Sequence, residues 1–178
     1  MIVPNADLKF ARDTLRAFID AVALARALQE LQPQPYSLKI ARNAAFDVAV
    51  ISWCILFGSD HAHHQKLHWK HMFDADPFRD GLLAAVGLTL DEWSEYRKVL
   101  VDYRNELAAH RDLNPDTTHH PNFSKGLLAA DFYYERLRER IQVETGQPPE
   151  GGTLTEHYSE RHEVFLKQMT TAIASLAN

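Results

Sequence analysis

The chain has 178 residues, of which 46% are hydrophobic and 24% charged, and its formal net charge is −5. This length is typical of one domain and this composition of a soluble globular protein, so a disordered chain, a collagen and a disulfide scaffold are excluded. An acidic chain also lacks the bulk positive charge of most nucleic-acid-binding domains. Any contact with RNA therefore requires a local basic patch.

The hydrophobic residues are of the kinds that favour helices. Ala and Leu total 43, whereas Val and Ile total only 16. Ala and Leu lose little conformational freedom in a helix, while β-branched residues prefer strands. We therefore predict an all-α fold in a single domain over residues 1–178. It is expected to be a helical bundle of four or five long helices plus one or two short helices.

The first predicted helix covers residues 6–31 and is capped by Asn5. Its apolar positions recur at helical spacing: Leu8, Ala11, Leu15, Phe18, Val22 and Ala25. A second helix is predicted over 37–57, with Gly58 as its stop. That segment is apolar nearly all round after Ala44, so we expect it at the centre of the fold.

Shorter helices are expected next, over residues 62–73 and from Asp76-Pro77 to Gly87. Thr89 and Glu92 have the spacing of a capping box, which predicts a helix that runs to about Arg111. One apolar seam runs along the length of that helix: Trp93, Tyr96, Leu100, Tyr103, Leu107 and His110.

Two more helices complete the predicted bundle. One covers residues 127–144 and is closed by Gly146. The last begins at a second capping box, formed by Thr153 and Glu156. One side of this final helix is apolar: Tyr158, Phe165, Met169, Ala172 and Leu176.

The single cysteine, Cys54, cannot form an internal disulfide and lies within an apolar run. This favours a small buried hydrophobe over a reactive thiol, and it suits a reducing cytoplasm. No signal peptide is visible, because Asp7 and Lys9 interrupt the N-terminal segment. The longest apolar stretch, 44–57, contains Asp47 and is too short to span a bilayer. We expect a cytoplasmic protein without a membrane partner.

The most suggestive motif is Asp102-Tyr103-Arg104-Asn105-Glu106-Leu107-Ala108-Ala109-His110-Arg111. It resembles the signature of the HEPN superfamily, in which an arginine, often followed by a polar residue, precedes a histidine by four to six residues. The resemblance implies an all-α bundle and a metal-independent endoribonuclease of the toxin–antitoxin or phage-defence type. It also implies a homodimer whose two motifs share one cleft, RNA or a nucleotide as ligand, and an antitoxin partner.

The side chains of this motif are suited to RNA cleavage independently of the resemblance. His110 titrates near neutral pH and can act as general base or acid, while the Arg104 guanidinium can stabilise charge on phosphoryl oxygens. Asn105 can orient the imidazole or hold the phosphate, and no cofactor is required. In a regular α-helix, Arg104 and His110 would lie roughly 120° apart around the axis and about 9 Å apart along it.

Simpler interpretations compete with catalysis. His110 and Tyr103 share the apolar seam, so His110 can be an interior histidine bonded to Asp47 of a neighbouring helix. Arg104 and Arg111 can belong to an ordinary solvated face. Asp47 either orients a catalytic pair, with Arg104 or His110 as its partner, or forms a structural ion pair. The corresponding function is a non-catalytic HEPN-like nucleotide-binding or protein-interaction module.

A cluster of histidines supports a third hypothesis, a histidine-metal helical bundle. His61, His64, His68 and His71 share one face if their segment is helical, and His64 and His68 have the i, i+4 spacing of two metal ligands. No third-ligand motif follows, and Lys66 and Lys70 oppose a cation, so the favoured expectation is no metal. Another stretch, Arg136, Arg138 and Arg140, alternates with glutamates and predicts a solvated face with local ion pairs.

Overall fold

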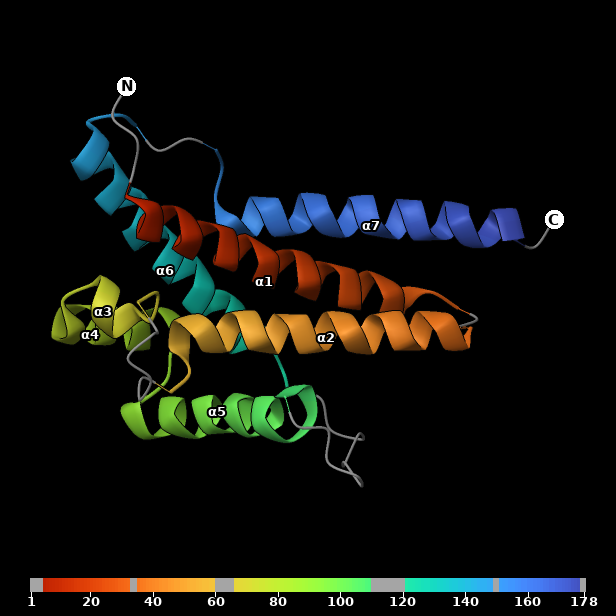
Figure 1. The fold of residues 1–178 in the computed structure, drawn as a ribbon, viewed down its shortest axis with the longest axis horizontal. Helices are drawn as coiled ribbons and strands as arrows, with labels where there is room; N and C mark the ends of the chain where they lie inside the picture. Colours follow the sequence, from red (N-terminus) through yellow and green to blue (C-terminus); the bar gives the residue numbers. More distant parts are fainter. Residues whose placement is uncertain (1–4, 33–34, 60–65, 110–120, 149–150, 177–178) are drawn as a thin grey trace.

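The computed structural model describes residues 5–32, 35–59, 66–109, 121–148 and 151–176 (Figure 1). Five long helices occur in these ranges: α1 (Ala6–Glu30), α2 (Tyr36–Phe57), α5 (Leu90–Tyr103), α6 (Ser124–Thr145) and α7 (Leu154–Leu176). Two short helices, α3 (Trp69–Met72) and α4 (Ala75–Val86), and a π-helical turn, η1 (Arg104–Ala109), complete the described part, which contains no strand. The predicted all-α bundle of four or five long helices and one or two short ones is confirmed.

The helices α7, α1, α2 and α5 lie side by side in one row, as Figure 1 shows. Helix α6 crosses this row next to α1, and α4 packs against α6 with α3 beside it. The end of the row that holds the start of α2 and the end of α7 is not covered by α6 (Figure 1). At that end, α7, α1 and α2 form a single layer (Figure 1).

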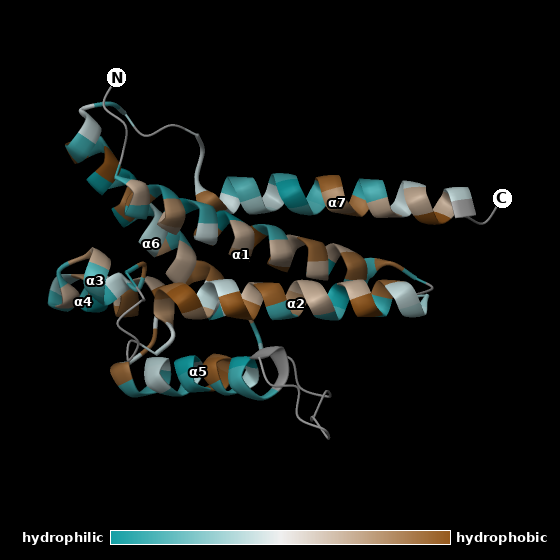
Figure 2. Ribbon diagram, viewed as in Figure 1, coloured by the Kyte–Doolittle hydropathy of each residue, from teal (hydrophilic) through white to brown (hydrophobic). Residues whose placement is uncertain are grey.

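Helix α1 occupies the centre of the fold. Its predicted apolar positions Leu8, Ala11, Leu15, Phe18, Val22 and Ala25 are all buried. It packs against α2, α6 and α7, and Ala23 and Ala27 are buried as well because neighbours approach from several sides. Helix α2 is hydrophobic over most of its length (Figure 2), but its Ile40, Val48, Ile51 and Ile55 side chains are exposed, so the expectation that α2 is the central helix is wrong.

Helix α2 has the length and mean hydropathy of a membrane-spanning helix over its 22 residues. However, 44% of its most apolar window is buried inside the protein. A core helix of a soluble protein meets the same criterion. Packing inside the protein therefore accounts for part of the apolar character of α2. The face that carries Ile40, Val48, Ile51 and Ile55 stays exposed.

An aromatic cluster forms the centre of the core behind α2. The Trp53 ring stacks on Phe57 with centroids 5.1 Å apart and lies 5.8 Å from Trp93. Phe57 meets the Tyr133 ring of α6 edge-to-face at 5.6 Å. Tyr96 anchors the start of α6, because its hydroxyl accepts a hydrogen bond from the Gly126 amide at 2.7 Å. Aromatic contacts of this kind bind α2, α5 and α6 into one core.

Most predicted helix ends are close to the observed ones. Asn5 caps α1 by accepting a hydrogen bond from the Asp7 amide, and Gly87 and Gly146 end α4 and α6 in the left-handed conformation. The helix predicted over 62–73 is wrong for its described part, in which α3 begins only at Trp69. His68 has an extended backbone with ψ 137°, which no helix can pass through.

The capping box at the start of α5 makes its stability depend on pH. The Glu92 carboxylate accepts hydrogen bonds from the Thr89 amide and hydroxyl, both at 2.8 Å. These bonds hold the pKa of Glu92 below its ordinary value of 4.5. A carboxylate with a lowered pKa stabilises the fold above its unfolded pKa, and this contribution is lost as pH falls through the folded pKa.

We therefore expect the Tm of Glu92→Gln to lie below that of the wild type near pH 6, with a gap that closes as pH falls below 4.5. Thermal unfolding followed by circular dichroism between pH 3 and pH 6 measures this gap. The exposed Glu95 of the same helix provides the matched control Glu95→Gln, for which a constant and smaller gap is expected. If the Tm of both variants changed with pH in the same way, the capping box would not be the source of the pH dependence.

Candidate functional site

The Arg/His motif begins where α5 ends. Along the predicted seam, Trp93, Leu100 and Tyr103 are buried and Tyr96 is half-buried, which confirms that part of the seam. At Arg104 the backbone changes from α-helix to the π-helical turn η1. The prediction of a regular α-helix to about Arg111 is wrong from this point, so the angle of 120° between Arg104 and His110 does not apply. His110 and Arg111 lie outside the described residues.

The first two motif residues are held together by hydrogen bonds. The Arg104 guanidinium donates to the Asn105 side-chain oxygen from Nε at 3.1 Å and from Nη2 at 2.8 Å. Asn105 is exposed and Arg104 is half-buried. This arrangement presents a fixed cation and a side-chain amide together at the surface, and both groups can donate hydrogen bonds to a phosphate.

Asp47 has a partner that the sequence did not predict, whereas the predicted partner His110 lies outside the described residues. Its Oδ1 accepts a hydrogen bond from the Tyr103 hydroxyl at 3.2 Å, and no bond to Arg104 appears among the described contacts. Tyr103 takes this place because it ends the buried seam of α5 at the level of Asp47 on α2. Burial, followed by the charge of Asp47 and the hydrogen bond to it, raises the pKa of Tyr103. Asp47 therefore joins α5 to α2 beside the motif.

The thiol of Cys54 lies under the same helix end. Its Sγ donates to the Leu100 carbonyl at 3.7 Å, and burial raises its pKa to about 11 despite the nearby positive charges of Arg104 and Arg97. The protonated thiol is a small buried hydrophobe, as predicted. Sequence reasoning did not single out Arg97. Its guanidinium donates to the Gly58 carbonyl at 3.1 Å, and its charge, like that of Arg104, acts on the Cys54 thiol.

The histidine-metal hypothesis loses one of its two proposed ligands to structural hydrogen bonds. His68 is 1% exposed, its Nδ1 accepts from the Lys70 amide at 3.3 Å, and its Nε2 lies 3.1 Å from the Gly58 carbonyl. Because Nδ1 accepts, Nε2 must carry the proton that bonds to the carbonyl. Neither nitrogen has a lone pair left for a metal. His61 and His64 lie outside the described residues, among which no group of three metal-binding side chains occurs.

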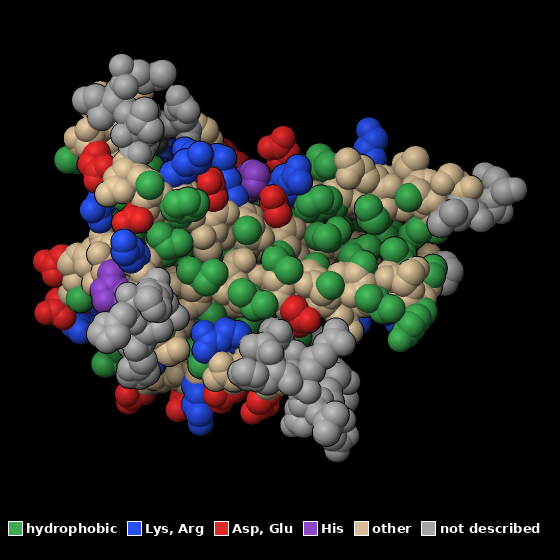
Figure 3. Space-filling model, in the orientation of Figure 1, with side chains coloured by type: hydrophobic (Ala, Val, Ile, Leu, Met, Phe, Trp, Pro, Cys, Tyr) green, Lys and Arg blue, Asp and Glu red, His purple; other side chains and the backbone are tan. Residues whose placement is uncertain are grey.

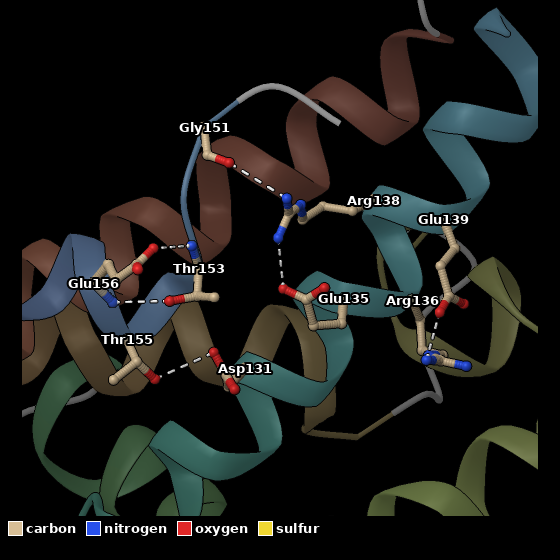
Figure 4. A network of polar contacts seen from close by, with 9 residues as sticks. All are labelled: Asp131, Glu135, Arg136, Arg138, Glu139, Gly151, Thr153, Thr155 and Glu156. Atoms are coloured by element: carbon tan, nitrogen blue, oxygen red, sulfur yellow. Dashed lines mark hydrogen bonds and ion pairs between the residues drawn. The ribbon is translucent and has the colours of Figure 1, made fainter. Parts of the chain in front are cut away.

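The arginines of α6 form the local ion pairs that the sequence predicts. Arg136 pairs with Glu139 at 2.6 Å, and Arg138 pairs with Glu135 at 2.9 Å (Figure 4). Arg140 lies 3.5 Å from Glu144. Tyr133 and Tyr134 of the same helix are buried in the core. This surface is thus a helix face with local ion pairs, as the sequence predicts.

Figure 4 also shows how α7 begins beside α6. Glu156 donates its amide hydrogen bond to the Thr153 hydroxyl at 3.1 Å and accepts one from the Thr153 amide at 2.8 Å. The second predicted capping box is therefore confirmed. The Thr155 hydroxyl donates to Asp131 of α6 at 3.4 Å, which fixes the first turn of α7 against the bundle.

The chain was compared with protein families, curated proteins and solved structures. No family model, curated protein or solved structure matches it. The function therefore has to be argued from the site itself.

Proposed function

We propose that this protein is a HEPN-like, metal-independent endoribonuclease that cleaves RNA with Arg104 and His110, assisted by Asn105. The observation that carries the proposal is the π-helical turn that begins at Arg104. Turns of this kind inside or at the end of α-helices are frequent at functional sites. Here the turn coincides with the motif and holds Arg104 and Asn105 together at the surface.

The reaction uses groups that RNA and the motif supply. The 2′-hydroxyl attacks the adjacent phosphorus, the bond to the 5′-oxygen breaks, and the products are a cyclic 2′,3′-phosphate and a 5′-hydroxyl. His110 transfers a proton from the attacking hydroxyl or to the leaving oxygen. Arg104 stabilises the negative charge that develops on the phosphoryl oxygens, with Asn105 holding the phosphate. No metal or other cofactor takes part.

The electrostatics near the motif are compatible with an acidic chain. The net charge of −5 opposes nonspecific RNA binding, so the proposed site relies on the positive charge of Arg104, which lies at the surface beside Asn105. The proposal includes a homodimer, an antitoxin partner and a role in toxin–antitoxin or phage-defence systems, as the HEPN resemblance implies.

The first test is cleavage of a broad panel of RNAs by the purified wild-type protein in excess EDTA. We expect cleavage, with cyclic phosphate and 5′-hydroxyl ends on the products. Absence of cleavage over the whole panel of RNAs would rule out the proposed ribonuclease activity. It would favour the alternative, a non-catalytic nucleotide-binding or protein-interaction module with the same fold.

A further inference from the structure

Helices α1, α6 and α7 line a cavity of about 370 Å³ beside the start of α7. Its walls are largely aliphatic, because the buried Ile19 and Leu154 and the α6 side chains Leu127 and Leu128 contribute to them. Cavities of about 300 Å³ or more can hold a small organic ligand. The described residues that line this one belong to neither α5 nor η1, so the cavity is separate from the Arg/His motif.

Arg26 of α1 brings a positive charge to the cavity. Its guanidinium is half-buried and lies against Tyr158 of α7: Nη1 donates to the Tyr158 hydroxyl at 2.9 Å, and Cζ is 5.5 Å from the centre of the ring. Among the described residues, no carboxylate forms an ion pair with Arg26. The other N–H groups of the guanidinium and the O–H of Tyr158 can therefore donate hydrogen bonds to the carboxylate of a ligand.

Asp131 of α6 brings a negative charge to the same cavity. Its Oδ1 accepts a hydrogen bond from the Thr155 hydroxyl at 3.4 Å (Figure 4). Burial raises the pKa of this carboxyl above its ordinary value of 3.8. No described cation forms an ion pair with Asp131. A carboxylate has about four acceptor positions, so the bond from Thr155 leaves room for the ammonium group of a ligand.

Other charged groups between α1 and α7 are paired with one another. Hydrophobic side chains gather on the face of α7, α1 and α2 that Figure 3 shows, and charged side chains are fewer there. His157 and Arg161 both lie 3.1 Å from Asp20, and His162 lies 3.0 Å from Glu30. A partly buried charge is unfavourable without a partner. A ligand with one anionic and one cationic group would supply both partners that the cavity lacks.

The separation of the two charged groups suits a ligand that carries both of its charges close together. Their hydrogen-bond partners on α7, Thr155 and Tyr158, lie about 4.5 Å apart along the helix axis at 1.5 Å per residue. An α-amino acid has its ammonium and carboxylate groups on one carbon atom. It can therefore contact Arg26 and Asp131 together while its side chain lies against the aliphatic walls. A simple carboxylic acid would leave Asp131 unpaired, and a simple amine would leave Arg26 unpaired.

We propose that the cavity between α1, α6 and α7 binds a free α-amino acid with an apolar side chain. Its carboxylate accepts hydrogen bonds from Arg26 and Tyr158, and its ammonium donates to Asp131. The side chain of the ligand packs between Leu127 and Leu154. This site goes beyond the proposed ribonuclease activity, because it shares no residue with the motif and its test uses no RNA.

Isothermal titration calorimetry of the wild-type protein with matched ligands tests the chemical class. We expect saturable binding of L-leucine or L-phenylalanine. 4-Methylpentanoate is leucine without its ammonium group, and 3-methylbutylamine is leucine without its carboxylate. Each should bind about tenfold or more weakly than L-leucine, because each lacks one charge-assisted contact. This comparison needs no variant, so it does not depend on how a substitution affects folding.

Two variants assign the two charges of the ligand to their partners. Asp131→Asn should weaken binding of L-leucine about tenfold or more and leave binding of 4-methylpentanoate no weaker than in the wild type. Arg26→Met should weaken binding of L-leucine and of 4-methylpentanoate but not of 3-methylbutylamine. Arg12→Met is the matched control, since Arg12 is a partly buried arginine of α1 that does not line the cavity. Far-UV circular dichroism checks that each variant is folded.

Three results would overturn the proposed site. The first is the absence of binding of both amino acids at millimolar concentrations. The second is binding of 4-methylpentanoate or 3-methylbutylamine as tight as that of L-leucine, because the cavity would then not recognise both charges. The third is binding of L-leucine to the folded Arg26→Met and Asp131→Asn variants with the affinity of the wild type, which would place the ligand elsewhere.

Discussion

Replacement of Arg104 with alanine should reduce RNA cleavage about 100- to 1,000-fold, the usual loss when one charge-stabilising donor is removed. The guanidinium is half-buried, and its described hydrogen bonds go to Asn105 of the same turn rather than to another helix. Its removal should therefore leave the bundle intact. Cleavage in EDTA at saturating RNA, measured beside thermal unfolding, separates the two effects.

Two further variants make the Arg104 prediction specific. Arg79→Ala removes an arginine that pairs with Asp76 on α4, away from the motif, and should cleave like the wild type. Arg104→Lys keeps the charge but loses the planar fork, so it should recover only part of the activity. If Arg104→Ala cleaved RNA at the rate of the wild type, the guanidinium would not be the group that stabilises the reacting phosphate.

Local patterns in the sequence are sufficient to predict most of the helices. Each start signal rests on neighbours within one turn, as in the bonds between Thr89 and Glu92. The burial of α1 follows equally well from the spacing of Leu8, Leu15 and Phe18. Such features depend on hydrogen bonds and periodicity that a short window contains.

Features set by tertiary contacts could not be obtained in this way. His68 lies in a histidine pattern of helical spacing, yet its ring bonds to the Gly58 carbonyl and its backbone is extended. The π-helical turn at Arg104 likewise has no local signal in the residues that form it. Asp47 could be identified as a carboxylate needing a partner, but the choice of Tyr103 depends on how α5 meets α2.

The apolar face of α2 shows that a hydrophobic pattern does not determine what covers each side of a helix. A segment that is apolar all round after Ala44 predicts burial on every side, and a single chain supplies neighbours for most of these sides only. Hydrophobic pattern reports which surfaces avoid water, but it does not report whether the same chain or another covers them.

Replacement of Trp53 with alanine should lower the free energy of unfolding by about 3 to 5 kcal/mol, the usual cost of deleting a large buried aromatic side chain. Trp53 is fully buried, stacks on Phe57 and meets the Tyr96 ring edge-to-face at 5.9 Å. Its loss leaves a cavity where α2, α5 and α6 meet. Urea unfolding followed by far-UV circular dichroism measures the change.

Trp53→Phe tests which part of the side chain stabilises the core. The buried Trp53 Nε1 has no hydrogen-bond partner among the described residues, and a Cβ added at Gly126 would lie only 3.3 Å from it. Phenylalanine keeps an aromatic ring in the stack and removes this unsatisfied donor, whose burial is unfavourable. We expect a cost below about 1.5 kcal/mol. If Trp53→Phe cost as much as Trp53→Ala, the volume of the indole, rather than ring stacking, would dominate the stability of this core.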